Sequence, residues 1–147
     1  ENIKISRPNI HWRVLDHLDT VVPPCLIQFR YNKFKSNVNI DLCRHPEITV
    51  TRRWNDKMSQ RDQKILLKIL LAPYQNEGYQ HFQTDLKLST LTAQGVNANN
   101  QIILLHYQFA PDRKFKNPVV VEMKISRNDY LDFKMAFQTV ADSLILE

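Results

Sequence analysis

Asp112, Glu122 and Lys124 are the residues whose types and spacing come nearest to a catalytic signature. Two carboxylates can hold a hard divalent cation such as Mg²⁺, and a lysine beside them can position water for attack on a phosphodiester. Glu122 and Lys124 stand two apart on an expected strand, so their side chains lie on one face of it. This set would support metal-dependent hydrolysis of nucleic acid.

A plainer structural interpretation of the same residues is favoured. Residues 111–118 (PDRKFKNP) have the composition of a charged hairpin turn, and Glu122 and Lys124 then point to solvent. The opposite face of the strand is apolar and is expected in the core: Val119, Val121, Met123 and Ile125. Because the spacing also resembles the PD-(D/E)xK signature of metal-dependent nucleases, that activity is kept as an alternative.

The cysteines and histidines do not complete a metal or nucleophile site. Cys43 and His45 could form half of a metal site, but no second half has ligand spacing. Neither Cys25 nor Cys43 has a recognisable His or acidic partner, and His106 is expected to be a hydrogen-bonded structural residue. No metal and no cofactor are predicted. Two cysteines are too few for a disulfide framework, which favours a reducing compartment, cytoplasmic or nuclear.

The net charge of +5 permits a nucleic acid as partner. The basic residues that could contact it lie in two clusters: Arg52 and Arg53, and Arg113, Lys114 and Lys116. Aromatic residues interleave with basic ones near the first cluster, as on base-stacking surfaces. Alternating strands produce the same pattern, so a solvated basic face is favoured and nucleic-acid binding is a second alternative.

Gly78 and Gly95 are the only glycines among 147 residues. Phosphate-binding loops and dinucleotide folds need glycine to bring backbone close to a ligand, so nucleotide-binding enzymes are disfavoured. No apolar run reaches the length that spans a membrane, and no membrane insertion is predicted. The chain starts at Glu1, which favours a fragment or a processed product.

The pattern of apolar residues predicts an α+β fold with an antiparallel sheet and two amphipathic helices, one central and one C-terminal. Strands are expected at 25–31, 38–42, 48–54, 82–88, 102–109 and 119–125, whereas residues 10–19 fit a strand or a short helix. A helix over 60–72 would be capped by Ser59 and ended by Pro73, and another would begin after a cap at Ser126. Residues 1–75 would hold a strand meander and the first helix. Residues 76–147 would hold a three-stranded sheet and the second helix, and both parts could form one compact domain.

The second half resembles a COMM domain, the C-terminal module of the COMMD proteins. The matching segments are FQTDLKLST (82–90), QIILLHYQF (101–109), VVVEM (119–123) and SRNDYLDFKMAFQTVADSL (126–144). The chain departs from that family at Phe82, where tryptophan is usual, in the long loop around Gly95 and in its first 75 residues, which do not look all-helical. The resemblance implies an obligate dimer that acts as a scaffold in endosomal cargo recycling.

The expected function is a non-catalytic protein–protein interaction or dimerisation module, a scaffold subunit of a larger complex. Its helices carry more apolar surface than a small sheet can cover, which suggests a partner protein or a second copy of the chain. The residues expected at that interface are Leu66, Ile69, Leu70, Tyr130, Phe133, Phe137, Val140 and Leu144.

Overall fold

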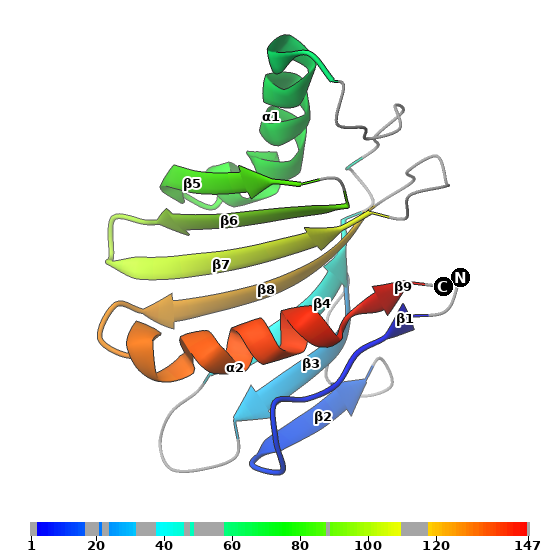
Figure 1. Cartoon of the computed structure of the whole chain (residues 1–147). Coiled ribbons are helices and arrows are strands. Elements are labelled where there is room, and N and C mark those ends of the chain that lie inside the picture. Colours follow the sequence, from blue (N-terminus) through cyan, green and yellow to red (C-terminus); the bar gives the residue numbers. More distant parts are fainter. Residues whose placement is uncertain are drawn as a thin grey trace.

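The computed structural model describes residues 3–16, 21, 24–31, 38–45, 48, 58–87, 89–109 and 118–146. Figure 1 shows the elements that they form. The strands are β1 (Ile3–Lys4), β2 (Trp12–Asp16), β3 (Cys25–Tyr31), β4 (Asn39–Arg44), β5 (Gln80–Leu86), β6 (Thr90–Val96), β7 (Gln101–Gln108), β8 (Val119–Ser126) and β9 (Ile145–Leu146). The helices are α1 (Gln60–Asn76) and α2 (Tyr130–Ser143).

The fold is α+β, built on one antiparallel sheet of seven strands in the order β2-β3-β4-β8-β7-β6-β5. β4 comes from the first half of the chain and pairs along its length with β8 from the second half. The segments 1–75 and 76–147 therefore share a single sheet. The short strands β1 and β9 pair with each other and bring the two ends of the described chain together (Figure 1).

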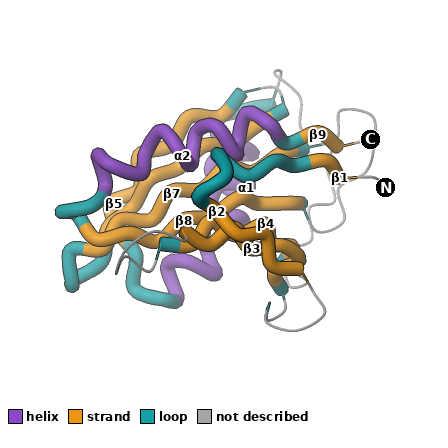
Figure 2. The backbone as a smooth tube through the Cα atoms, turned by 90° about the horizontal axis from the view of Figure 1, so that it is seen from below, coloured by secondary structure: helices purple, strands orange, loops and turns teal. Residues whose placement is uncertain are grey.

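The sheet separates two hydrophobic cores because side chains alternate between its faces. On one face, Leu66, Leu70 and Tyr74 of α1 pack with Ile103 and Leu105 of β7. On the other face, α2 packs over β8 and β7, and its buried residues meet the apolar side of the strands: Phe137, Val140 and Leu144 against Leu104, Val121 and Met123. Figure 2 shows the two helices on opposite sides of the strands.

Most of the predicted strands are present, with one addition. β3, β4, β5, β7 and β8 lie at or within a few residues of the expected positions, and the ambiguous 10–19 segment contains β2. β6 was not predicted, so the second half contributes four strands to the sheet rather than three. Its core-facing positions are Leu91, Ala93 and Gly95, and only Leu91 has a large apolar side chain, which gives little apolar alternation. The expected strand at 48–54 lies largely outside the described residues.

Helix α1 begins as predicted but ends later. The Ser59 hydroxyl accepts a hydrogen bond from the Asp62 backbone N–H at 3.2 Å, which confirms the cap. The expectation that Pro73 ends this helix is wrong, because the helix continues through it to Asn76. Proline removes one backbone donor, but burial of Tyr74 in the next position holds the last turn against the sheet.

Helix α2 begins later than the predicted cap at Ser126. Ser126 is the last residue of β8, and Asp129 precedes the first helical residue, Tyr130. The Ser126 hydroxyl donates to Asp129 Oδ2 at 3.0 Å, so the two residues close the connecting turn instead of capping the helix. None of the helices in the described part of the chain is long and apolar enough to cross a membrane.

Candidate functional site

A groove runs between α2 and the strands that this helix leaves uncovered. α2 lies over β8 and β7, while β6 and β5 continue beyond it (Figure 1). The groove has a volume of about 280 Å³. Residues that line it include Gln83 and Asp85 of β5, Thr92 and Gln94 of β6, Leu104 and His106 of β7, and Lys134, Phe137 and Gln138 of α2.

The strand register explains why this part of the sheet is polar. Gln83, Gln94 and Leu104 are neighbours in one cross-strand row, and Asp85, Thr92 and His106 are neighbours in another. Only the β7 end of each row is buried; the β5 and β6 ends are open to solvent. The groove thus has an apolar side under α2 and an amide- and hydroxyl-rich side over β5 and β6.

His106 is the buried polar side chain of this groove, with 8% of its surface exposed. Its Nε2 lies 3.0 Å from Gln108 Oε1. Its Nδ1 has no hydrogen-bond partner among the described residues. A buried polar atom without a partner costs free energy, which a polar group entering the groove could recover.

Charges of opposite sign flank the groove. Lys134 of α2 lines one side, and its Nζ lies 5.5 Å from the centre of the Tyr130 ring. Tyr130 in turn donates a hydrogen bond to Gln94 Oε1 at 2.9 Å, which ties the start of α2 to β6. Asp85 lies on the other side, in an exposed ion pair with Lys87 at 3.7 Å. Exposed pairs of this kind contribute little to stability, so Asp85 is free to exchange its partner.

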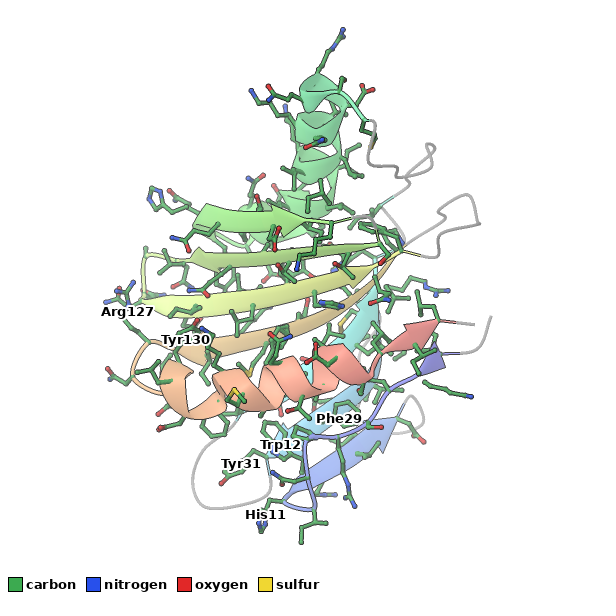
Figure 3. All side chains as sticks on the ribbon, in the orientation of Figure 1. His11, Trp12, Phe29, Tyr31, Arg127 and Tyr130 are labelled. Carbon is green, nitrogen blue, oxygen red and sulfur yellow. A yellow bond between two sulfur atoms is a disulfide. The ribbon has the colours of Figure 1, made fainter. Side chains whose placement is uncertain are left out.

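A second hollow, of about 440 Å³, lies at the other side of α2. Its wall is aromatic: the Trp12 ring lies 5.3 Å from the Tyr31 ring, and Phe133 is in edge contact with both. Figure 3 shows Trp12 of β2 and Tyr31 of β3 close together below α2, with His11 just before the start of β2. The three rings pack against one another, so their main role is in the hydrophobic core.

The face beside α1 holds a buried cluster of polar groups. The Tyr74 hydroxyl donates to Glu122 Oε2 at 2.5 Å, and His45 Nε2 lies 2.9 Å from the same hydroxyl. A hydroxyl has one proton to give, and here it goes to Glu122. His45 Nε2 is then the donor in its own contact with the hydroxyl. All three residues are buried.

Burial raises the pKa of two groups in this cluster, Glu122 and Tyr74. Desolvation raises the pKa of Glu122, although the Tyr74 hydrogen bond and the Lys124 charge oppose the shift. Desolvation and the neighbouring Glu122 carboxylate raise the pKa of Tyr74 well above its ordinary value, so the phenol stays protonated. Glu122 is thus a carboxyl that holds its proton to higher pH than a surface glutamate does.

Polar residues continue from Glu122 across β4 and β3. Asp41 is the register partner of Glu122 and also of Gln28. Gln28 Nε2 donates to Asp41 Oδ1 at 2.8 Å, and desolvation raises the pKa of this carboxyl too. Two strand positions from Glu122, Lys124 pairs with Glu77 at 2.7 Å, with both side chains partly exposed.

Cys25 and Cys43 are joined by a disulfide bond. They are register partners on β3 and β4, which places their side chains next to each other. The sequence showed no acidic partner for either cysteine, and this expectation is wrong because Glu122 lies beside the bond. Both sulfurs and a Glu122 carboxylate oxygen lie within 4.8 Å of one another, the one such group of three potential metal ligands among the described residues. While the sulfurs are bonded to each other they lack the thiolate charge that binds a metal.

The predicted catalytic set, Asp112, Glu122 and Lys124, does not come together as expected among the described residues. Glu122 was expected at the surface, but only 8% of it is exposed, because Tyr74 of α1 covers this part of β8. Lys124 is exposed as predicted. Asp112 lies outside the described residues, as do the predicted nucleic-acid contacts Arg52, Arg53, Arg113, Lys114 and Lys116.

Most of the predicted interface residues belong to the interior of the chain itself. Leu66 and Leu70 are buried in the α1 core, and Phe137, Val140 and Leu144 are buried in the α2 core. Ile69 is exposed at 36%, and Tyr130 and Phe133 are partly exposed. Two of the eight lie at the groove: Phe137 lines it, and Tyr130 binds Gln94 of its wall.

Sequence reasoning missed the groove and the Cys25–Cys43–Glu122 group. Both depend on strand order: Cys25 and Cys43 meet through the β3–β4 pairing, and Glu122 joins them because β8 is the next strand to β4. The available signal was that Cys25 starts one expected strand and Cys43 directly follows the end of the next. An antiparallel hairpin of those two strands brings such positions together.

No family model matches the chain, and no curated protein matches it. Among solved structures, it is similar to the solution structure of cyanobacterial PsbP (CyanoP) from Synechocystis sp. PCC 6803. The two share 15% sequence identity over 94% of this chain and 83% of that chain, with a TM-score of 0.48. A similarity at this level assigns neither a family nor an activity.

The expected resemblance to a COMM domain is wrong. No family model matches any part of the chain, residues 80–144 included. In the structure, β6 occupies the segment that the resemblance treats as a loop, and β8 continues the sheet into β4. Residues 80–144 are therefore part of a larger sheet, and the dimer and the recycling role implied by the resemblance lose their basis.

Proposed function

We propose that this chain is a non-catalytic interaction module that binds an extended segment of a partner protein in the groove between α2 and strands β5–β7. The observation that carries the proposal is the open, polar part of the sheet beside α2, with the unpartnered Nδ1 of His106 in it. Ligand sites combine an apolar surface with a few convergent polar groups, as this groove does.

The chemistry of the lining suits a peptide. The amide and hydroxyl groups of Gln83, Gln94, Gln138 and Thr92 can pair with peptide N–H and C=O groups. Phe137 and Leu104 offer apolar contact beside them. Lys134 on one side would favour a segment with an acidic residue there, and Asp85 on the other side would favour a basic residue.

The described polar groups on the α1 side do not form an open pocket for a substrate. Tyr74 covers Glu122, and Lys124 is paired with Glu77, so neither is presented to a substrate in an open pocket. Neither nuclease activity nor nucleic-acid binding has a comparable observation in its favour, and no second function is proposed.

Selection from a phage-displayed library of random peptides tests the proposal. Peptides enriched on the wild-type protein should lose binding when Thr92→Arg fills the groove, as measured by isothermal titration calorimetry. The matched control is Thr139→Arg, which adds the same charge at an exposed position of α2 that does not line the groove. This variant should bind the peptides like the wild type.

Two outcomes would contradict the proposal. One is a selection in which every enriched peptide binds Thr92→Arg as well as it binds the wild type. The other is a concentration-dependent dimer in sedimentation that Thr92→Arg abolishes, because the groove would then be occupied by a second copy of the chain.

A further inference from the structure

We propose that Cys25–Cys43 is a redox-active disulfide that exchanges with an external dithiol, and that Glu122 supplies the proton to the leaving Cys43. The proposal rests on a geometry that is independent of the groove: a cross-strand disulfide lies directly beside a buried carboxyl group on the α1 face.

The two sulfurs differ in access. Cys43 is fully buried, at 0% exposure, whereas Cys25 is partly exposed at the start of β3. We infer that a small thiolate attacks the disulfide at Cys25 rather than at Cys43. This asymmetry fixes the direction of exchange, because the attacked sulfur forms the mixed disulfide and the other sulfur leaves.

The leaving sulfur needs a proton. A thiolate in an apolar interior is unfavourable, since burial disfavours the charged form of the group. Cys43 is surrounded by apolar residues such as Ile48 and Val120, and the Glu122 carboxyl oxygen within 4.8 Å is the acid at hand. Tyr74 holds that carboxyl in place through its hydrogen bond to Oε2.

The exchange can be written with its atoms and electrons balanced. A dithiol thiolate attacks Cys25 Sγ, the S–S bond breaks, and its electron pair passes to Cys43 Sγ, which takes the proton from Glu122. The second thiol group of the dithiol, as thiolate, then attacks the dithiol's other sulfur, which is bonded to Cys25 in the mixed disulfide. Cys25 leaves as a thiolate and takes a proton from water. The protein disulfide gains two electrons, and the dithiol is oxidised to a disulfide.

Several groups around Glu122 set the pH at which it can act. Tyr74 of α1 and His45 after β4 face it, with Asp41 on β4 and Lys124 on β8. Glu77 pairs with Lys124 and so tempers its charge. Burial raises the pKa of Glu122 in spite of the opposing Tyr74 and Lys124, which keeps the acid form available to a higher pH than for a surface glutamate.

The test is the rate of reduction of the folded protein by dithiothreitol, followed by mass spectrometry after thiol alkylation. In the wild type the rate should rise in proportion to dithiothreitol concentration. Glu122→Gln keeps the shape of the side chain but cannot act as an acid, and it should slow reduction about 10²-fold, the scale of general acid catalysis. Asp142→Asn is the control. It removes a carboxyl group from the exposed side of α2, on the other face of the sheet from the disulfide, and it should reduce like the wild type.

The proposal would be overturned if Glu122→Gln and Asp142→Asn were reduced at the same rate. It would also be overturned if the wild-type rate were independent of dithiothreitol and equal to the rate of unfolding, as for an inert structural disulfide. Should Glu122→Gln fail to fold by circular dichroism, the wild-type pH profile decides. The rate per dithiothreitol thiolate should fall as pH rises through the pKa of Glu122, and a flat profile would contradict the role of this residue.

Discussion

The Tyr74 hydroxyl lies 2.5 Å from Glu122 Oε2, although the two residues are 48 positions apart in the chain. Tyr74 stands in the last turn of α1, immediately after Pro73, and Glu122 stands in the middle of β8. The contact forms because the helix continues through Pro73 and places Tyr74 over β8. The contact gives the buried carboxyl its hydrogen bond and attaches α1 to the centre of the sheet.

Removal of that hydroxyl should destabilise the fold. Tyr74→Phe leaves Glu122 and His45 without the partner they share, and we expect a loss of about 1–3 kcal/mol in the free energy of unfolding. Urea denaturation monitored by circular dichroism measures it. Tyr79→Phe is the control, because the Tyr79 hydroxyl has no hydrogen-bond partner among the described residues. An equal loss in both variants would show that the ring, and not the hydroxyl, matters.

Glu122 should make stability depend on pH. Its pKa in the folded protein is raised above the ordinary value of 4.5, so the folded state binds a proton that the unfolded chain releases. This contribution is complete below pH 4.5 and is lost as pH rises through the folded pKa. Asp41, with an ordinary value of 3.8, acts in the same direction from a lower pH.

Glu122→Gln removes this dependence. The stability of the variant relative to the wild type should therefore increase from pH 4.5 up to the folded pKa of Glu122 and stay level above it. Thermal unfolding at a series of pH values gives the comparison. A constant difference between the two proteins across this range would mean that Glu122 has the same pKa in the folded and unfolded states.

Two methionines, one buried and one exposed, test which strand and helix faces belong to the core. Met123 on β8 is fully buried, whereas 74% of Met135 on the outer side of α2 is exposed. Met123→Ala should cost about 2–5 kcal/mol because it opens a cavity in the α2 core. Met135→Ala should change the free energy of unfolding by no more than about 0.5 kcal/mol. Similar losses at both positions in chemical denaturation would contradict the assigned strand face.

Gly95 should be intolerant of a side chain. A Cβ atom at this position would lie 2.6 Å from Cε1 of Phe82, so the ring must shift to admit it. We expect Gly95→Ala to cost about 1–3 kcal/mol through overpacking. The double variant Gly95→Ala with Phe82→Leu should recover part of that loss, and strictly additive effects would argue against the contact.

The amino-acid sequence by itself determined the α+β class, most strands and the start of α1, because these follow from local periodicity and capping. The alternation of Val119, Val121 and Met123 correctly assigned the core face of β8. The same alternation predicted that Glu122 would be exposed, and this prediction is wrong because Glu122 is buried. A polar position on the other face is exposed only when no element covers it, and the placement of α1 over that face is not encoded in β8.

Tertiary structure alone decided the groups that could perform chemistry or bind a ligand. Cys25, Cys43 and Glu122 meet because β3, β4 and β8 are adjacent in the sheet, although β4 and β8 are far apart in sequence. The groove exists because α2 crosses β8 and β7 and leaves β6 and β5 uncovered. Strand order and helix placement are settled by the burial of whole faces against one another, which short-range patterns in the chain do not specify.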